Sequence, residues 1–447
     1  MSFLPVIFED QTLRGFRPLA WSVPVCELRC GLLNGRERVA ATAGVEPVLL
    51  VRGMLQGLAA AGGYRAGMGD VIAAGQDILL LSARLAFHWD LLERAMAAAE
   101  AGPVAWRDAE GWLAVTVPAG GVAAAMQGWR QWERDADEAG CWRDPAAPLP
   151  GFEPATAADP ESVDGALSRI WDLVPATAAA IAADLQRLGG RLPARRTWGA
   201  VPDGEAAWAE ATDLAPLDAA AWPGVTVRGD APVLAGADID LAPGTVIDAK
   251  AGPVVLGRGV RVLPHSYLEG PLYLGNHSLV KAGTTIYGET SIGAVCKVAG
   301  EIGESTFLDF VNKQHEGFIG HAYLGSWCNL GALTTCSDLK NTYGNIRVDL
   351  GHGAEDSGRR FVGLLMGEHG KTAIGTMFNT GTTVGFSSNV FSSGFPDKCL
   401  PCYTWGDGGG TERQDHARAL ATAATVMQRR GCRCTPGHDE VFRSLAG

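Results

Sequence analysis

Aliphatic residues recur at every sixth position through the middle of the chain. The unbroken series consists of Leu256, Val262, Leu268, Leu274, Val280, Ile286, Ile292 and Val298. A helix would turn these residues onto different faces because its period is near 3.6, and a half-buried strand needs a period of two. The six-residue period instead predicts a parallel β-helix, in which each hexapeptide forms one side of a prism and points its aliphatic residue inward.

The N-terminal part of the chain has a different pattern. Short apolar runs at residues 5–8, 48–51, 78–81 and 112–117 alternate with alanine-rich helical stretches, and an amphipathic helix is expected over residues 170–188. This alternation predicts an α/β layer structure. The expected domains, in order, are an α/β domain over 1–190, a linker over 191–230, a β-helix over 231–405 and a helical tail over 406–447.

Two segments interrupt the six-residue period. Residues 309–318 break it, and residues 338–360 form a longer polar excursion. Loops that protrude from a solenoid are where binding residues gather, so both segments are expected to protrude and carry function. The open β surface of a prism needs capping or pairing. Proteins of this architecture usually pack three prisms side by side, and by this analogy we expect a homotrimer.

Composition and charge narrow the classes of function. The 447 residues are 47% hydrophobic and 19% charged, which is typical of a globular protein. A net charge of −12 disfavours nucleic acid as a partner and leaves small anionic substrates open. The first residues do not resemble a signal peptide, and no apolar stretch is long enough to span a membrane. We therefore expect a cytoplasmic protein without membrane insertion, whose ten cysteines are reduced.

Two strings in the β-helix carry a resemblance to a known family. Residues 312–325 (NKQHEGFIGHAYLG) and 329–336 (NLGALTTC) resemble the acetyltransferase half of the bifunctional N-acetylglucosamine-1-phosphate uridyltransferase/glucosamine-1-phosphate acetyltransferase family. Strings that resemble a group of sugar nucleotidyltransferases of this type lie at residues 8–31, 168–173, 296–302, 327–332, 339–345 and 375–385. The resemblance implies a nucleotidyltransferase-like α/β domain joined to a left-handed β-helix. It also implies acetyl-CoA or another acyl-CoA, NTP with Mg²⁺, and a sugar phosphate or nucleotide sugar as ligands.

Candidate residues for acyl transfer lie in and after the two interruptions. Histidine titrates near neutral pH, so His315 is a candidate base for an amine or hydroxyl that attacks a thioester, and the resemblance places it at the catalytic histidine of the family. His369 is an alternative base, and Lys313, Lys371 and Asn379 are candidates for binding the acyl-CoA. The structural alternatives are a surface histidine at the end of a loop, a polar residue at a coil corner, and capping of the coil by Asn379.

The segment after the first apolar run bears on nucleotide binding. Nucleotidyltransferases of the resembled type place a Gly-rich loop here, whose backbone N–H groups cradle phosphates. This chain reads EDQTLRG over residues 9–15, without those glycines. Glu9 and Asp10 are candidate Mg²⁺ ligands, with a solvated turn as the alternative. Four arginines are candidates for binding phosphate: Arg14, Arg17, Arg29 and Arg84. The alternative is ordinary surface exposure for the first three and packing at the end of a strand for Arg84.

The four cysteines of the C-terminal part are Cys399, Cys402, Cys432 and Cys434. Four thiolates can bind structural Zn²⁺, but the single residue between the last two favours free thiols.

Two functions from different classes remain open. The first is a transferase of nucleotide-sugar metabolism, acting by nucleotidyl transfer, acyl transfer or both. The second is a non-catalytic sugar-nucleotide-binding trimeric scaffold or regulator. The missing Gly-rich loop favours the second function, whereas the segment that contains His315 favours the first.

Overall fold

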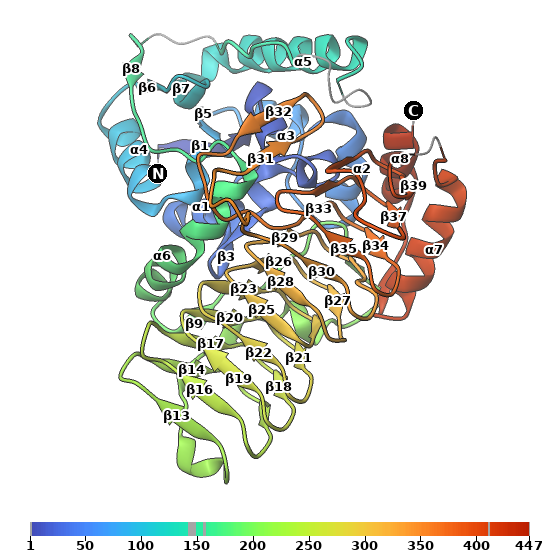
Figure 1. Ribbon diagram of the computed structural model, residues 1–447. Helices are drawn as coiled ribbons and strands as arrows, with labels where there is room; N and C mark the ends of the chain where they lie inside the picture. Colours follow the sequence, from blue (N-terminus) through green and yellow to red (C-terminus); the bar gives the residue numbers. More distant parts are fainter. Residues whose placement is uncertain (1, 142–148, 155–157, 410–411, 447) are drawn as a thin grey trace.

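The computed structural model describes residues 2–141, 149–154, 158–409 and 412–446. An α/β domain at the N-terminus is followed by a left-handed parallel β-helix, and two C-terminal helices lie beside both (Figure 1). This architecture confirms the fold class predicted from the two sequence patterns. None of the described helices is long and apolar enough to cross a membrane.

A six-stranded sheet with the order β4-β1-β5-β7-β6-β8 forms the centre of the N-terminal domain. Its strands are β1 (Phe3–Phe8), β4 (Val48–Leu50), β5 (Asp77–Ser82), β6 (Ala105–Arg107), β7 (Trp112–Val117) and β8 (Glu161–Ser162). Strands β4 and β5 are parallel to β1 and lie on opposite sides of it. The carboxyl ends of β1 and β5 therefore form a topological switch point, where open α/β sheets bind their ligands.

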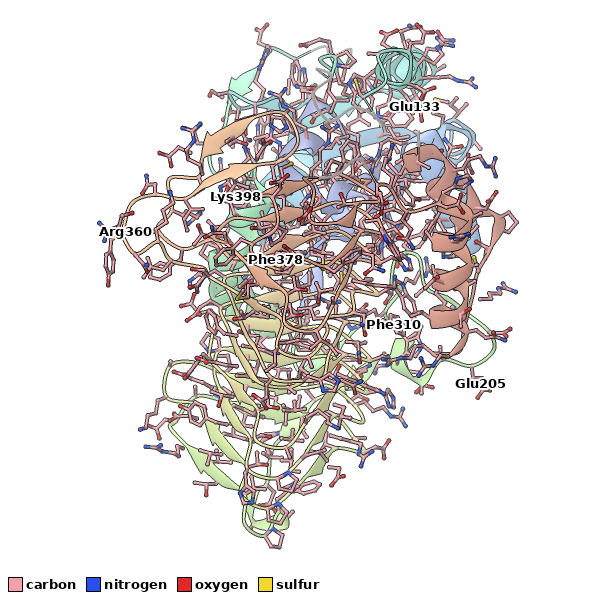
Figure 2. The ribbon with its side chains drawn as sticks, turned by 45° about the vertical axis from the view of Figure 1, so that its right-hand side comes forward. Glu133, Glu205, Phe310, Arg360, Phe378 and Lys398 are labelled. Atoms are coloured by element: carbon pink, nitrogen blue, oxygen red, sulfur yellow. The ribbon has the colours of Figure 1, made fainter. Side chains whose placement is uncertain are left out.

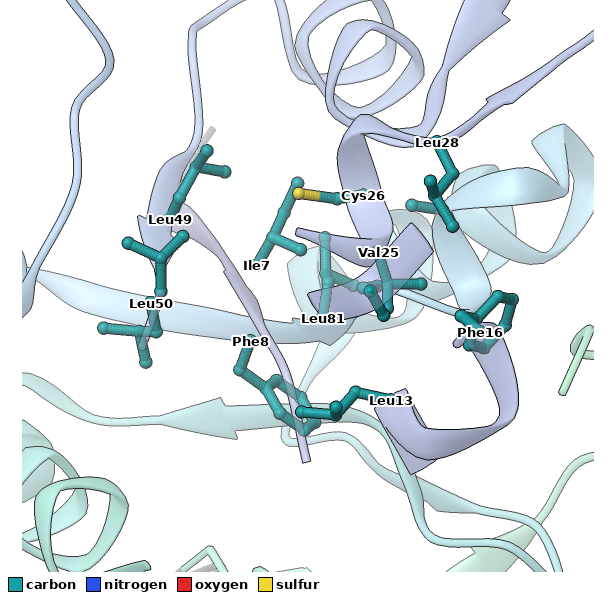
Figure 3. Packing of buried hydrophobic residues seen from close by; sticks show 14 of the residues in the cluster. Ile7, Phe8, Leu13, Phe16, Val25, Cys26, Leu28, Leu49, Leu50 and Leu81 are labelled. Atoms are coloured by element: carbon teal, nitrogen blue, oxygen red, sulfur yellow. The ribbon is translucent and has the colours of Figure 1, made fainter. Parts of the chain in front are cut away.

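Every residue of β1 is buried, which explains its continuous apolar sequence. Figure 3 shows Ile7 and Phe8 packed among Leu13, Leu50 and Leu81. The helices of this domain are α1 (Gly35–Ala43), α2 (Gly53–Ala61), α3 (Met68–Ala73), α4 (Trp89–Ala101), α5 (Val122–Glu138) and α6 (Ile170–Leu188).

The β-helix has three sides. The longest side contains β12 (Ala215–Pro216), β14 (Val233–Ala235), β17 (Val254–Leu256), β20 (Leu272–Leu274), β23 (Thr290–Ile292), β26 (Thr306–Phe307), β29 (Tyr323–Leu324), β33 (Leu365–Met366), β36 (Thr383–Val384) and β38 (Cys399–Leu400). The second contains β13 (Thr226–Arg228), β16 (Val246–Asp248), β19 (Tyr267–Glu269), β22 (Thr285–Ile286), β25 (Glu301–Gly303) and β28 (Phe318–Gly320). The third contains β15 (Asp240–Leu241), β18 (Arg261–Val262), β21 (Leu279–Val280), β24 (Lys297–Val298) and β27 (Asn312–Lys313), and farther along β34 (Lys371–Thr372), β37 (Asn389–Val390) and β39 (Trp405–Gly406).

Pairing between coils explains the six-residue period. Leu256 pairs with Leu274, eighteen residues farther along the chain, so one coil contains three hexapeptides. All eight aliphatic residues of the series are at most 1% exposed. They form the core of the prism, as the period predicts.

The protruding loop predicted at residues 309–318 is wrong. Ile286 pairs with Ile302, and Val298 pairs with Lys313, so this coil is two or three residues shorter than eighteen. The shortened coil shifts the sequence period, but the solenoid continues through β27 and β28 without a protrusion. The segment over 338–360 does leave the solenoid, between β30 (Thr335–Cys336) and β35 (Met377–Phe378).

The excursion forms the hairpin of β31 (Arg347–Asp349) and β32 (Ala354–Asp356), which reaches the N-terminal domain (Figure 1). The segment expected as a linker contains β9 (Arg191–Leu192), β10 (Val201–Pro202) and β11 (Thr212–Asp213) before the first coils. The C-terminal elements are α7 (His416–Gln428), β40 (Cys432–Arg433) and α8 (Pro436–Ala446). Helix α8 packs against α2, where a Cβ atom at Gly437 would lie 2.4 Å from the carbonyl carbon of Gly57.

Candidate functional site

The turn after β1 places two carboxylates at the carboxyl edge of the sheet. Asp10 caps a short 3₁₀ helix (Gln11–Phe16) by accepting a hydrogen bond from the backbone N–H of Thr12 at 2.9 Å. Glu9 points elsewhere: one oxygen accepts from the Val25 N–H at 2.9 Å and the other from Arg52 Nε at 3.2 Å. Burial raises the pKa of Asp10 although the hydrogen bonds from Thr12 oppose the rise. A capped helical turn therefore occupies the place of a Gly-rich loop.

The two carboxylates do not fit a Mg²⁺ site. Both Glu9 oxygens are bonded within the fold, and Asp10 has a single carboxylate oxygen without a hydrogen-bond partner among the described residues. The described residues contain no group of three or more His, Cys, Asp or Glu side chains that could hold a metal ion.

Arg84 follows β5 at the same edge and is paired within the protein. Its two terminal nitrogens donate to both carboxylate oxygens of Asp108, at 2.7 and 2.9 Å, and one of them also donates to Ser168 Oγ. Partial burial opposes ionisation of Asp108, but the hydrogen bonds and charge of Arg84 hold its pKa below the usual value. This bidentate pair positions the loop before β7.

Arg14 and Arg17 lie together on the turn, but their surroundings differ. Arg17 is buried, donates to the Cys141 carbonyl at 2.9 Å and lies over the Trp21 ring at 3.8 Å. Burial and the neighbouring Arg52 lower its pKa to about 9, so Arg17 remains charged at neutral pH. The Arg14 side chain is exposed and has no bonded partner in the described part of the chain.

His352, in the tight turn of the β31–β32 hairpin, lies near enough to these two arginines for their charges to act on it, and its Nε2 is 3.9 Å from Glu355 Oε1. Burial, followed by the charges of Arg14 and Arg17, lowers the pKa of His352. Its Nδ1 atom is buried and has no hydrogen-bond partner among the described residues. The hairpin is held to the domain by Glu355, which pairs with Arg169 at 3.2 Å. Arg14 and Arg17 thus form a cationic cluster between the sheet edge and the excursion, and the neutral imidazole of His352 lies beside it.

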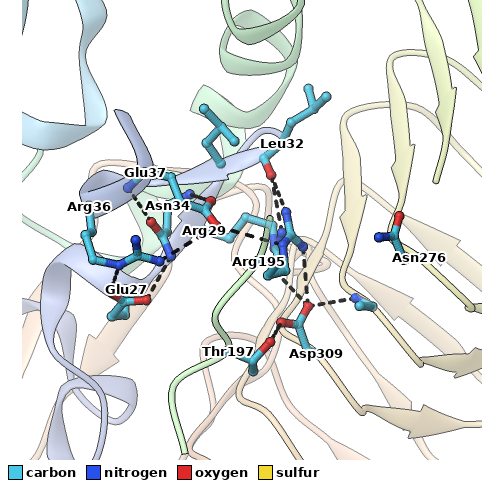
Figure 4. Close-up of polar contacts among 12 residues, drawn as sticks. Glu27, Arg29, Leu32, Asn34, Arg36, Glu37, Arg195, Thr197, Asn276 and Asp309 are labelled. Carbon is cyan, nitrogen blue, oxygen red and sulfur yellow. Dashed lines mark hydrogen bonds and ion pairs between the residues drawn. The ribbon is translucent and has the colours of Figure 1, made fainter. Parts of the chain in front are cut away.

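Arg29 lies away from this cluster, at the interface with the β-helix (Figure 4). It pairs with Asp309 at 2.7 Å, and Arg195 approaches the same carboxylate at 3.6 Å. Asp309 also accepts hydrogen bonds from Thr197 Oγ1 and from the Ala294 N–H. Burial opposes the charge of Asp309, but the two arginines hold its pKa below the usual value. The side chain of Arg29 is bound inside this interface and does not face the cationic cluster.

On the β-helix, Lys313 occupies an inward position in the column that contains Val280 and Val298. Its Nζ donates to the carbonyls of Ala299 and His315, both at 2.7 Å. Burial lowers its pKa to about 8. The His315 side chain is exposed at the following corner, so Lys313 fixes the backbone of that corner from inside the prism.

The remaining β-helix candidates do not gather around His315. His369 is buried between aromatic rings, stacked at 6.2 Å from Trp327 and packed edge-on against Phe442. Burial, then the charge of Lys371, lowers the pKa of His369 well below its usual value. Lys371 donates to the His369 carbonyl at 2.9 Å. Asn379 is exposed two coils away from His315 and accepts from the N–H of its neighbour Thr380. Lys313 and Lys371 are bonded inward and do not fit as surface contacts for an acyl-CoA.

The ten cysteines are free thiols in the described structure. Burial raises the pKa of Cys402 to about 11 and of Cys432 to about 12, so both remain protonated at neutral pH.

Sequence reasoning missed several polar residues that the fold brings together. Asp309, Arg195 and Glu368 are buried at the domain interface, and burial raises the pKa of Glu368 to about 8. His321 and Asp338 are hydrogen-bonded at 2.8 Å across neighbouring coils. The partners Asp309 and Arg195 are distant in sequence, and His321 and Asp338 belong to different coils, so no local motif marks either pair. Predicting the contact between His321 and Asp338 would require knowing which residues of neighbouring coils lie side by side. The shortened coil shifts that register, so the sequence period does not give it.

Residues 5–191 match the family model described as sugar nucleotidyl transferase. No match is found among curated proteins. The matched segment contains the six-stranded sheet and ends just after α6. The N-terminal domain is therefore similar to sugar nucleotidyl transferases, and the β-helix lies outside the match.

Proposed function

We propose that this chain is a transferase of nucleotide-sugar metabolism that binds a nucleoside triphosphate or a nucleotide sugar at the carboxyl edge of β1 and β5. The similarity of residues 5–191 to sugar nucleotidyl transferases is the observation that carries the proposal. The position of the cationic cluster supports it, because Arg14 and Arg17 belong to the turn that follows β1 at the topological switch point. Guanidinium groups bind phosphates through planar, paired donors.

In nucleotidyl transfer, an oxygen of the sugar phosphate forms a bond to the α-phosphorus of the nucleotide while pyrophosphate leaves. The exposed side chain of Arg14 can contact a phosphate, whereas Arg17 is held by Trp21 and Cys141 and contributes only its charge. The expected roles of Arg29 and Arg84 in phosphate binding are not proposed further, because Asp309 and Asp108 occupy their guanidinium groups.

A pyrophosphate-release assay tests this function. The full chain is incubated with UTP or dTTP and a panel of sugar 1-phosphates, and Arg14→Ala is compared with Arg433→Ala, which removes an exposed arginine of β40. Turnover that falls at least tenfold in Arg14→Ala and is unchanged in Arg433→Ala supports the proposal. Turnover that Arg14→Ala does not alter contradicts it.

The second candidate is a non-catalytic binder of sugar nucleotides. The capped turn after β1 favours it, because Glu9 is engaged by Arg52 and Val25 and leaves no paired carboxylates for a metal. Nucleotide-sugar binding without pyrophosphate release would select this function over the transferase. The homotrimer remains a prediction of both candidates.

For the β-helix we propose acyl transfer with His315 as the base, supported by its exposed position at a corner that Lys313 fixes. An amine or hydroxyl would attack the thioester carbon of an acyl-CoA, pass its proton to His315 and release the thiol. Free-thiol detection with acetyl-CoA and amino sugars tests this step. Loss of thiol release in His315→Ala is the expected result, and unchanged release contradicts the assignment.

A further inference from the structure

A cavity of about 280 Å³ lies where four parts of the chain meet. The segment after β1, the β31–β32 hairpin, the last coils of the β-helix and α8 each contribute to its wall. Its apolar lining includes Pro18, Trp21, Leu350, Leu400, Pro401 and Leu445. A cavity of this size is close to the lower limit of pockets that bind small organic ligands.

Strand β38, which forms one wall of the cavity, is tied to the parts of the chain on both sides of it. Lys398, directly before this strand, donates from Nζ to the carbonyl of Arg347 in the hairpin at 3.2 Å, and Figure 2 shows Lys398 beside the excursion. Shortly after the strand, the hydroxyl of Tyr403 donates to the Phe442 carbonyl of α8 at 2.6 Å. These bonds fix the hairpin and α8 at either side of the cavity.

The cavity has one charged side chain in its lining. Among the lining residues that the structure describes, Arg413 is the only arginine or lysine, and none is a carboxylate or a histidine. The Arg413 side chain is exposed, and its Nη2 donates to the carbonyl of Cys402 at 3.4 Å. This single long bond places the guanidinium at the end of β38 and leaves its other donors available to a ligand.

Two cysteines of the C-terminal part, Cys399 and Cys402, also line the cavity. Burial raises the pKa of Cys402 to about 11 and raises the pKa of Cys399 as well. Both thiols are therefore protonated at neutral pH and act as small apolar groups in the wall. Each is half-buried, so a thiol reagent that enters the cavity can reach it.

The positive charge is confined to one end of the cavity. The charges of Arg17 and Arg413 act on the Cys402 thiol, whereas those of Asp349 and Asp397 act on the other thiol. The carboxylate of Asp349 accepts two backbone N–H groups in the turn of the hairpin, and neither aspartate belongs to the lining. An anionic group therefore fits at the end of the cavity marked by Cys402, with an apolar body along the remaining wall.

We propose that this cavity binds a small apolar monocarboxylate, an organic acid with a single carboxylate on an aromatic or aliphatic body. The carboxylate pairs with Arg413 through the planar donors of the guanidinium. The apolar body fills the space between Trp21, Leu400 and Leu445. A phosphate monoester would bring close to two negative charges to a lining with one guanidinium. The site is separate from the phosphate contact of Arg14, and its existence does not depend on nucleotidyl transfer.

Cysteine footprinting of the full chain tests the site. The protein is alkylated with iodoacetamide at alkaline pH in the presence of phenylacetate, 3-phenylpropionate or hexanoate, and labelling is measured by peptide mass spectrometry. We expect at least one acid to slow the alkylation of Cys399 and Cys402. Labelling of Cys434, which is half-buried and outside the lining, should not change. Phenylacetamide and phenyl phosphate, matched to phenylacetate in their ring, should protect less.

Arg413→Gln should raise the concentration needed for half-maximal protection about tenfold or more, because a hydrogen bond between charged groups is lost. Arg433→Gln, the matched control at an exposed arginine of β40, should leave this concentration unchanged, and so should Arg14→Ala. Arg413 is exposed, so its replacement does not disturb the core.

Two results would overturn the proposal. One is that none of the three acids protects Cys399 and Cys402, or that protection is equal in wild type and Arg413→Gln. The other is protection that Arg14→Ala removes, which would place the acid at the sheet edge instead. Because Arg14→Ala and Arg413→Gln are scored separately, failure of the nucleotide site and failure of this site are distinguishable.

Discussion

Replacement of Asp309 by alanine should destabilise the contact between the two domains. Asp309 is 3% exposed and accepts hydrogen bonds from Arg29, Thr197 and the Ala294 N–H, with Arg195 at 3.6 Å (Figure 4). Its removal leaves the buried guanidinium of Arg29 without its carboxylate and leaves Arg195 with Glu37 at 4.0 Å. Loss of one partner from a buried ion pair costs about 3–5 kcal/mol. Since folded proteins are stable by about 5–15 kcal/mol, this loss is a large share of the total.

The assay is urea unfolding at pH 7 and 25 °C, followed by tryptophan fluorescence, with amide hydrogen exchange to localise the loss. We expect the free energy of unfolding to fall by about 3–5 kcal/mol and exchange to increase around Arg29 and Arg195. In the double variant with Arg29→Met, part of this cost should disappear, because one unpaired charge is removed. A change below about 0.5 kcal/mol in Asp309→Ala, the range of ordinary surface substitutions, would refute the structural role of the pair.

Three further predictions concern buried groups. The folded protein holds the proton of Glu368 more tightly than the unfolded chain does, because burial raises the pKa of Glu368 to about 8. The free energy of unfolding of the wild type should therefore fall by up to about 5 kcal/mol as the pH rises from about 4.3 to about 8. Urea denaturation of Glu368→Gln over the same pH range should not show this fall. For Lys313 the unfolded chain holds the proton more tightly, because burial lowers the pKa of Lys313 to about 8 in the folded protein. The free energy of unfolding should therefore rise by up to about 3 kcal/mol between about pH 8 and pH 10.4, and Lys313→Met should not show this rise. Equal pH slopes of the free energy of unfolding in the two proteins would contradict the inward position of Lys313. Gly437→Ala should lower the free energy of unfolding by about 1–3 kcal/mol because α8 is forced away from α2, whereas Gly394→Ala, which meets no atom within 4 Å, should not.

The β-helix was predictable because its period is local. Between Leu256 and Val298 each coil repeats its contacts after eighteen residues, as Leu256 and Leu274 show, so a one-dimensional pattern determines a three-dimensional core. The prediction of a protruding loop at residues 309–318 was wrong because a change in the six-residue period can arise in two ways. A shortened coil and an inserted loop look alike in sequence, and the pairing of Val298 with Lys313 distinguishes them.

The candidate site was less predictable because charged residue types do not reveal their partners. Arg29, Arg84 and Arg14 are equally plausible phosphate ligands in sequence, but Asp309 and Asp108 bind the first two inside the fold. These carboxylates are distant in sequence, and only tertiary structure brings them to the arginines. Lys313 likewise reads as a surface cation, although the coil register directs it inward.

Nucleotide binding by the full chain tests the central claim most directly. Isothermal titration calorimetry with UTP, dTTP and a UDP-sugar is carried out on wild type, Arg14→Ala and Arg433→Ala. We predict that wild type and Arg433→Ala bind at least one of these ligands with equal affinity, and that Arg14→Ala binds it about tenfold or more weakly, because a charged hydrogen bond to phosphate is lost. Absence of binding to all three ligands, or equal binding by wild type and Arg14→Ala, would contradict a nucleotide site at the carboxyl edge of β1 and β5.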